Sequence, residues 1–481
     1  MLYGNGNGII SSDETESEVT ELMAFYGREE QLKKLSKLCL GDKCSFALIY
    51  GRRRVGKSEL IKQSLLETGC SAIYYECKQT TEKNNVESLS DIIAEKFALP
   101  QLGFKDKEAV LDYLFKKAED SPLVLVLDEY PYLRSAVRGL DSILQTLLDK
   151  YREKSKFKLI VCGSFVEIMK SLLLRENPLY GRVDLAIDLK PMDYYDSAKF
   201  YANFSNEDKV RLYGVFGGIP YYNKLIDDSL SVEENVRELI ASSEARLANE
   251  VDMYLRTEIA KITNANEVFE ALAKGFSKYS DLLSQSHVSS GPAMIDVLDK
   301  LISMEVVAKE APINDERNKR KTGYYIIDNL SLYYFRYIFR YSSQLSIMHP
   351  LTFYNKYIRD DFETIYVPKI FENICKQYLV RQNRSGLMEE PFFKIGKYYY
   401  DDPQTRTNGE FDIVTEDDKG YLFYEAKFRN APLTQEIIDK EIAQVQATGL
   451  NCYRYGFFSK SGFAVAPRVK EVFIELTDLY R

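Results

Sequence analysis

The sequence has no tryptophan and only two histidines, His287 and His349, among its 481 residues. Enzymes that use a histidine base, and metal centres built mainly on imidazole, are therefore disfavoured. The seven cysteines include no CxxC pair, so we expect free thiols rather than disulfides or a zinc site. No apolar run approaches the roughly 18 residues that cross a bilayer, and the N-terminus lacks the basic and apolar regions of a secretion signal. These absences predict a cytoplasmic protein without membrane spans.

Apolar and charged residues are abundant and make up 45% and 28% of the chain. This composition excludes a largely disordered protein, and at roughly 150 residues per domain the length predicts about three domains. The formal net charge is −8, which argues against a non-specific DNA coat but is compatible with a local basic groove.

Short apolar runs alternate with helical patterns in the first part of the chain, as at 45–51, 123–130 and 158–164. Apolar strands between helices predict a parallel sheet covered on both faces, and hence an α/β fold. We expect a disordered extension, an α/β core, a helical lid, a winged helix–turn–helix region and a smaller C-terminal α/β domain. The expected bounds of these parts are 1–22, 23–195, 196–265, 266–345 and 350–481.

The segment after the first apolar run fits the P-loop pattern GxxxxGK(S/T). Its residues are Gly51, Arg52, Arg53, Arg54, Val55, Gly56, Lys57 and Ser58. In such a loop the backbone N–H groups and the positive end of the following helix cradle phosphate oxygens. Lys57 would contact the β- and γ-phosphates of ATP, and Ser58 would bind Mg²⁺. The alternative is a glycine-bearing turn with an incidental lysine.

A second acidic element follows the apolar run Leu123–Leu127. Asp128 and Glu129 would lie at the carboxyl end of that strand, where ligands bind in parallel sheets. Asp128 can hold Mg²⁺ through water, and Glu129 can orient or deprotonate the attacking water. The alternative is a solvated acidic turn, in which the two adjacent carboxylates would repel each other.

These motifs resemble the AAA+/STAND class of P-loop ATPases, and more closely the archaeal-type ATPases, over residues 23–330. The resemblance also rests on FYGRE (25–29), LIVCGS (159–164), PLYGR (178–182) and GGIP (217–220). It implies that Tyr26, Gly27 and Arg28 lie near the adenine and that Ser164 senses the γ-phosphate. It further implies that Arg182 is a cationic finger, acting in cis or across a subunit contact, although an ordinary ion-paired arginine is an equal alternative. GGIP would couple nucleotide state to the lid.

Residues 279–306 fit a helix–turn–helix, and a cationic segment would form the wing between two strands. The wing residues are Arg317, Asn318, Lys319, Arg320 and Lys321. The cations could grip phosphates, but the second helix has few groups suited to reading bases. Direct DNA binding and a structural role inside the ATPase body both stay open.

A carboxylate–lysine cluster is expected near the C-terminus. Strand alternation puts Glu425 and Lys427 on one face, and Asp412 would join them if its strand is the hairpin neighbour. Two carboxylates can hold a divalent cation, and a lysine can position water against a phosphodiester. Glu372, on the preceding helix, could complete the metal shell.

The order D…ExK with an upstream helical glutamate resembles the PD-(D/E)XK nucleases, and the nuclease-like domain that ends many archaeal-type ATPases. This resemblance covers residues 350–481, predicts a restriction-endonuclease-like fold, and adds Gln444 and Gln446 as further candidates. An ordinary charge pair on an exposed strand is the alternative.

The main hypothesis is an ATP-hydrolysing switch fused to a DNA nuclease that uses Mg²⁺ or Mn²⁺, with nucleotide state gating DNA binding or cleavage. One alternative is a nucleotide-dependent regulator or scaffold that binds DNA or a protein without cutting. Another is a protein or RNA remodeller that assembles with ATP as a ring, a homo-oligomer in which Arg182 would act in trans.

Overall fold

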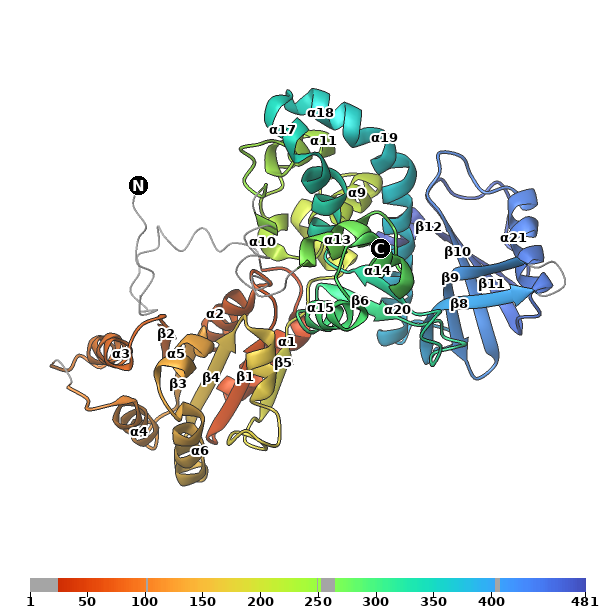
Figure 1. Cartoon of the computed structure of the whole chain (residues 1–481). Helices are drawn as coiled ribbons and strands as arrows, with labels where there is room; N and C mark the ends of the chain where they lie inside the picture. Colours follow the sequence, from red (N-terminus) through yellow and green to blue (C-terminus); the bar gives the residue numbers. More distant parts are fainter. Residues whose placement is uncertain (1–24, 101–102, 249, 252–263, 403–406) are drawn as a thin grey trace. The chain divides into compact units, whose positions relative to one another are not determined.

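The computed structural model describes residues 25–100, 103–248, 250–251, 264–402 and 407–481. The predicted extension, 1–22, lies outside this part of the chain. The chain divides into two compact units between Pro191 and Met192, four residues before the expected end of the α/β core. Each unit is described by itself below (Figure 1).

The first unit contains the predicted parallel sheet. Its strand order is β2-β3-β4-β1-β5, and all neighbours are parallel. The strands are β1 Ser45–Tyr50, β2 Ala72–Glu76, β3 Leu123–Asp128, β4 Phe157–Gly163 and β5 Leu185–Asp188. The helices are α1 Glu29–Cys39, α2 Lys57–Thr68, α3 Glu82–Lys96, α4 Lys107–Lys117, α5 Tyr130–Ala136, α6 Leu140–Tyr151 and α7 Val166–Ser171.

The continuous apolar strands are explained by burial on both faces of this sheet. Every residue of β3 and of β4 is buried. Phe46 and Leu48 of β1 belong to a core with residues of α3 to α7. Ile49 points to the opposite face by strand alternation and is also fully buried. All carboxyl ends of these parallel strands therefore meet at one edge, where β1 leads into the P-loop.

The second unit begins with a helical part. Its helices are α8 Tyr194–Ala198, η2 Lys199–Tyr201, α9 Asn206–Phe216, α10 Pro220–Asn223 and α11 Val232–Leu239. The GGIP segment separates α9 from α10, as the sequence predicts. Gly218 is required there, because an added Cβ would lie 1.9 Å from the carbonyl oxygen of Met192.

The predicted winged-helix region follows. It contains α13 Ala265–Ala273, α14 Tyr279–Gln285, α15 Gly291–Ser303, and the antiparallel pair β6 Val307–Glu310 and β7 Gly323–Ile326. The wing, residues 311–322, is not free along its length. The Ile313 amide donates to the Lys397 carbonyl oxygen at 2.8 Å, and the Ile313 side chain is buried in the C-terminal core. The wing is thus packed against the C-terminal sheet.

A run of helices leads to that sheet. It comprises α16 Asn329–Tyr333, the π-helical turn η3 Tyr334–Ile338, η4 Phe339–Tyr341, α17 Ser342–Ile347, α18 Pro350–Tyr357, α19 Arg359–Asp361, the π-helical turn η5 Phe362–Tyr366 and α20 Val367–Arg384.

The C-terminal sheet has the order β12-β11-β10-β9-β8. Its elements are β8 Lys394–Asp402, β9 Thr407–Asp417, β10 Gly420–Lys427, α21 Gln435–Ala447, β11 Cys452–Ser459, β12 Glu471–Glu475 and η6 Leu476–Tyr480. β8, β9 and β10 form an antiparallel meander, and β11 and β12 add in parallel after the α21 crossover. The sequence did not predict β12, whose five residues carry a glutamate at each end.

The seven cysteines are free thiols, as predicted. In the described part of the chain, no helix combines the length and the apolar composition needed to span a bilayer.

Candidate functional site

The P-loop connects β1 to α2 through backbone conformations that favour glycine. Gly56, which precedes α2, has φ 94°, and Arg54 has φ 66°. A Cβ on Gly51 would lie 2.2 Å from the carbonyl oxygen of Leu189. The loop therefore passes close to the chain that leaves β5, and only glycine fits at its first position.

Lys57 lies inside this loop. Its ammonium donates to the carbonyl oxygens of Gly51 at 3.0 Å and Arg52 at 2.9 Å, and the residue is only 6% exposed. A buried ammonium held by neutral carbonyls has no full counter-charge from them. An anionic phosphate would supply that charge.

The two predicted magnesium-binding residues are in direct contact. The Ser58 hydroxyl donates to Asp128 Oδ2 at 2.6 Å, and the Tyr74 hydroxyl donates to the same oxygen. Burial, and then the charge of Asp128, keeps the pKa of Tyr74 far above its usual range. Tyr74 therefore stays a neutral donor. A hydroxyl and a carboxylate oxygen at this spacing are the donor types that Mg²⁺ prefers, so these residues fit the ion.

Glu129 lies beside this pair and is held by the predicted sensor residue. Its Oε2 accepts from the Ser164 hydroxyl at 3.0 Å and from the Ser164 amide at 3.3 Å. Glu129 has φ 49°, a left-handed conformation that costs about 1–3 kcal/mol in a non-glycine residue. The turn thus directs the carboxylate away from Asp128 and toward the end of β4.

The segment Tyr26–Arg28 lies at the same edge of the sheet. Gly27 and Arg28 both have positive φ, at 66° and 67°, and the Arg28 guanidinium donates to the Lys190 carbonyl oxygen. Lys190 follows the carboxyl end of β5, next to the P-loop strand. The sequence motifs on 26–28, 51–58, 128–129 and 164 are therefore brought to one edge.

The carboxylate–lysine cluster also forms. The antiparallel register pairs Tyr424 with Ile413, which sets Glu425 beside Asp412. Lys427 Nζ is 2.5 Å from Glu425 Oε1 and 3.1 Å from Glu441 Oε1 on α21.

Glu372 faces this group from α20. Burial, reinforced by the charges of Asp412 and Glu425, raises the pKa of Glu372 to about 7. Burial, despite the nearby Lys427, also raises the pKa of Glu425. These carboxylates therefore share one electrostatic environment that disfavours their negative charge.

Two lysines neutralise the carboxylates of this cluster. Lys397 Nζ is 3.2 Å from Asp412 Oδ1 and 3.2 Å from Glu410 Oε2, while Lys427 holds Glu425. Among the described residues, no three acidic, cysteine or histidine side chains are gathered closely enough to hold a metal ion. Binding of a divalent cation by these carboxylates would require Lys397 and Lys427 to move away from Asp412 and Glu425.

The other predicted residues of this domain lie elsewhere. Gln444 donates to the Tyr400 hydroxyl at 3.1 Å, and Gln446 bonds with Tyr455.

In the wing, Lys321 pairs with Asp315, whereas Arg317, Lys319 and Arg320 are exposed.

Comparison with known families identifies the first part of the chain. Residues 25–226 match the family described as an ATPase domain predominantly from Archaea. This chain carries an archaeal-type ATPase domain. Residues 334–442 match a second family, described as archaeal and bacterial proteins of unknown function.

Two kinds of relatives accompany the ATPase domain. An uncharacterized protein of Methanocaldococcus jannaschii is 28% identical over 412 residues, which are 84% of this chain and 88% of that one. Among solved structures, the Walker-type ATPase PABY2304 of Pyrococcus abyssi aligns with TM-score 0.49 and 20% identity, covering 65% of this chain and 96% of that one. The ORC2 protein of Aeropyrum pernix aligns with TM-score 0.48 and 13% identity, covering 66% and 95%.

Arg182 of the ATPase domain lies far from the P-loop edge. Its guanidinium forms a bidentate pair with Asp149, at 2.9 and 2.7 Å. Because β5 pairs Leu185 with Ala47, Arg182 lies near the amino end of β1. At about 3.3 Å per residue, the six residues of β1 separate it from the loop. It cannot reach a phosphate of the same chain in this conformation.

Sequence reasoning missed Tyr74, Lys397 and Glu441, which contact the predicted residues directly. None belongs to a motif. Only strand register and helix placement bring them into contact, so the sequence offered no signal for them.

Proposed function

We propose that the protein is an ATP-driven switch whose C-terminal domain binds DNA and cuts it with Mg²⁺ or Mn²⁺. ATP binding rests on the archaeal-type ATPase domain. The observation that carries the nuclease proposal is the meeting of Asp412, Glu425 and Glu372 beside Lys427, in the order of elements αβββαβ.

In the ATPase domain, ATP would displace the Gly51 and Arg52 carbonyls from Lys57 and supply its counter-charge. Ser58 and Asp128 would hold Mg²⁺, which neutralises phosphate charge when bound. Glu129 would leave Ser164 to orient the attacking water, and Ser164 would then be free to contact the γ-phosphate. While the Glu129–Ser164 hydrogen bond is formed, Glu129 would not be available to orient the attacking water and Ser164 would not be available to contact the γ-phosphate. The AAA+/STAND assignment remains part of this proposal.

In the C-terminal domain, cleavage requires Lys397 and Lys427 to release Asp412 and Glu425. Asp412, Glu425 and Glu372 would hold the divalent ion, whose positive charge would offset the repulsion among these carboxylates and the negative charge of the phosphodiester. Lys427 would then face the scissile phosphate.

The test is plasmid cleavage by the full chain in Mg²⁺ or Mn²⁺, run beside ATP hydrolysis. Asp412→Ala and Lys427→Ala should abolish cleavage and keep ATP hydrolysis. Lys57→Ala should abolish ATP hydrolysis, and its effect on cleavage reports the gating. Wild-type protein that leaves every DNA form intact in both metals would disprove the nuclease.

A second candidate is a regulator that binds DNA or a protein in response to ATP without cutting. The neutralisation of Asp412 and Glu425 by lysines favours it, since a charge-paired cluster needs no metal. It predicts salt-sensitive binding that changes with ATP, with no product in the cleavage assay.

Arg182 could assist ATP hydrolysis only from a neighbouring subunit, because it lies away from the P-loop of its own chain. If a homo-oligomer brings Arg182 to a neighbour's phosphates, Arg182→Ala should lower ATP hydrolysis at high protein concentration and have no effect on isolated monomers. Equal loss at all concentrations would contradict this role.

A further inference from the structure

A single aromatic side chain links the C-terminal cluster to the helical part of the second unit. Phe428 follows Lys427 directly in the chain, at the end of β10. Its ring lies 5.2 Å, centroid to centroid, from the ring of Phe371, the residue before Glu372 on α20. The backbone neighbours of a candidate lysine and a candidate carboxylate are therefore in contact.

Two cations cover the same ring. Lys460 Nζ is 5.0 Å and the Arg211 guanidinium carbon 5.9 Å from the Phe428 ring centroid, within the range of cation–π attraction. The Lys460 amide also donates to the Lys427 carbonyl oxygen at 3.1 Å. Lys460 thus contacts the Lys427–Phe428 segment through both its backbone and its side chain.

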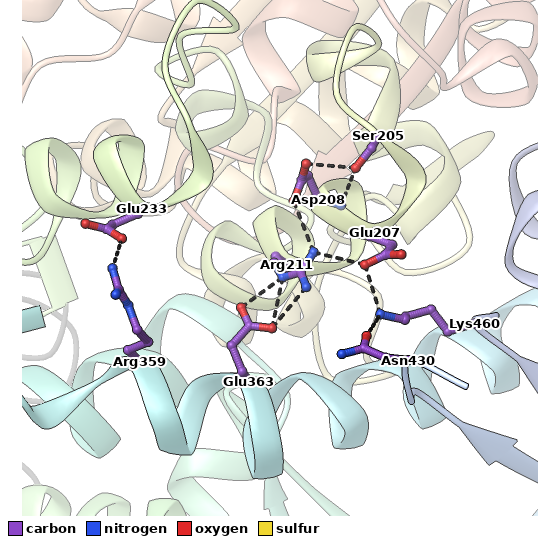
Figure 2. A network of polar contacts seen from close by, with 9 residues as sticks. All are labelled: Ser205, Glu207, Asp208, Arg211, Glu233, Arg359, Glu363, Asn430 and Lys460. Atoms are coloured by element: carbon purple, nitrogen blue, oxygen red, sulfur yellow. Dashed lines mark hydrogen bonds and ion pairs between the residues drawn. The ribbon is translucent and has the colours of Figure 1, made fainter. Parts of the chain in front are cut away.

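Glu207, at the start of α9, joins these cations, as Figure 2 shows. Its Oε2 is 3.0 Å from Lys460 Nζ and 3.6 Å from Arg211 Nη1. Arg211 is fixed further by Glu363 on the π-helical turn η5, with contacts of 2.9, 3.2 and 3.0 Å. One carboxylate oxygen therefore bridges a cation of α9 and a cation that follows β11.

The burial of these charges is uneven. The side chain of Lys460 is 5% exposed and that of Arg211 17%, whereas Glu207 is 42% exposed. A buried ammonium that loses its carboxylate becomes an uncompensated charge. The Lys460 side chain would then have to turn out to water, which removes its cation–π contact with the Phe428 ring and leaves the Lys427–Phe428 segment less well fixed.

We propose that Glu207, Arg211 and Lys460 are positioning residues that set the place of Lys427 and Glu372 through Phe428. This inference rests on the proposed nuclease function and names the residues outside the cluster that would hold its lysine and its helical glutamate in place.

The experiment compares Glu207→Gln, Lys460→Met and Lys460→Arg in the full chain. Glu207→Gln and Lys460→Met should lower kcat for Mn²⁺-dependent cleavage by at least about tenfold, since a misplacement of about 1 Å costs up to about a hundredfold. KM for DNA and the rate of ATP hydrolysis should stay unchanged. Lys460→Arg keeps the cation and should restore most of kcat.

Arg359→Met is the matched control. Arg359 pairs with Glu233 of α11 in the same helical part, and Figure 2 shows this pair apart from the network of Arg211. The variant removes an ion pair of the same helical part that does not touch Phe428; its arginine side chain is 48% exposed, and kcat should stay unchanged. An equal fall in kcat for Arg359→Met would assign the effect to general destabilisation and overturn the proposal.

A second measurement is independent of cleavage. Hydrogen–deuterium exchange should show faster exchange of the amides at 458–464 in Glu207→Gln and Lys460→Met, by about tenfold, with no change in Arg359→Met. If the wild type cuts no DNA but the exchange changes, the nuclease fails while the positioning stands. Unchanged exchange and unchanged kcat in both variants would refute the positioning role.

Discussion

Asp128 connects the separate features of the nucleotide site. Its side chain accepts from the Ser58 and Tyr74 hydroxyls and from the Glu129 amide, and the residue is only 6% exposed. The Asp128 side chain is therefore fixed in place by three donors, with the Ser58 hydroxyl in direct contact with it.

Substitution of Tyr74 tests this arrangement. Tyr74→Phe removes one hydrogen bond to Asp128, worth about 1 kcal/mol, so we expect ATP hydrolysis to fall about fivefold and the Mg²⁺ requirement to rise. Tyr113→Phe, on a half-exposed ring beside Phe104, is the control and should have no effect. The rate of ATP hydrolysis is measured over a series of Mg²⁺ concentrations. A Mg²⁺ dependence of Tyr74→Phe identical to that of the wild type would count against this role of Tyr74.

The raised pKa of Glu372 makes stability depend on pH. The ordinary pKa is 4.5 and the folded value about 7, so the folded chain binds more protons between these values. Stability therefore falls as pH rises through this window. Glu372→Gln removes the effect, and at pH 8 we expect it to be about 2 kcal/mol more stable than wild type.

Urea unfolding at pH 4.5 and pH 8 measures the difference, which should vanish at the lower pH. Glu389→Gln is the control, because Arg454 lowers the pKa of Glu389 and its replacement should bring no gain at pH 8. Equal stability of the Glu372→Gln variant and the wild type at pH 8 would show that the folded protein does not disfavour the charged form of Glu372.

Residue types were predictable from sequence wherever a motif fixed the backbone as well as the side chain. The P-loop specifies its own turn, so the contact between Ser58 and Asp128 followed from two motifs at one sheet edge. The partners of Asp412 were not predictable, because Lys397 reaches it only through the register of β8 on β9. Contacts between residues outside any motif, such as that of Lys397 with Asp412, depend on how the strands pair, which no local sequence pattern specifies.

Elements meet through close backbone contacts at two glycines on either side of one short segment. Leu189 lies against Gly51, and three residues later Met192 lies against Gly218. The alternation of strands and helices, and the helices followed by a hairpin over residues 279–326, were predictable from periodicity. The packing of the wing against β8 was not predictable from sequence, since it depends on Ile313, whose side chain is buried in the core of the C-terminal sheet.

Gly218→Ala tests the second contact. Its Cβ would lie 1.9 Å from the Met192 carbonyl oxygen, and overpacking of this kind costs about 3 kcal/mol. Gly103→Ala is the matched control, because nothing lies within 4 Å of a Cβ there, and its effect should stay within about 0.5 kcal/mol. Urea unfolding of the full chain compares them. Equal stability of the two variants would contradict the close contact.

The charge of the whole molecule is unevenly distributed, and this bears on its partner. The chain carries a net charge of −8, yet the wing presents Arg317, Lys319 and Arg320 within four residues, all exposed. Because the Asn314 amide donates to the Tyr399 carbonyl oxygen of β8 at 2.7 Å, these cations are held next to the domain that contains Asp412. DNA that contacts the wing would therefore lie near the candidate cleavage site.

The salt dependence of DNA binding tests this arrangement. Each phosphate contact contributes about −0.9 to the slope of log K against log salt, so replacing Arg317, Lys319 and Arg320 by alanine should make the slope shallower by about 2.7. The matched control replaces Lys33, Lys37 and Lys116, which are exposed on the ATPase domain, and changes the net charge equally. Fluorescence anisotropy of a labelled duplex from low to moderate salt gives both slopes. If the two triple variants lose the same amount, overall charge rather than the wing governs binding, because only a local contact can separate variants of equal net charge.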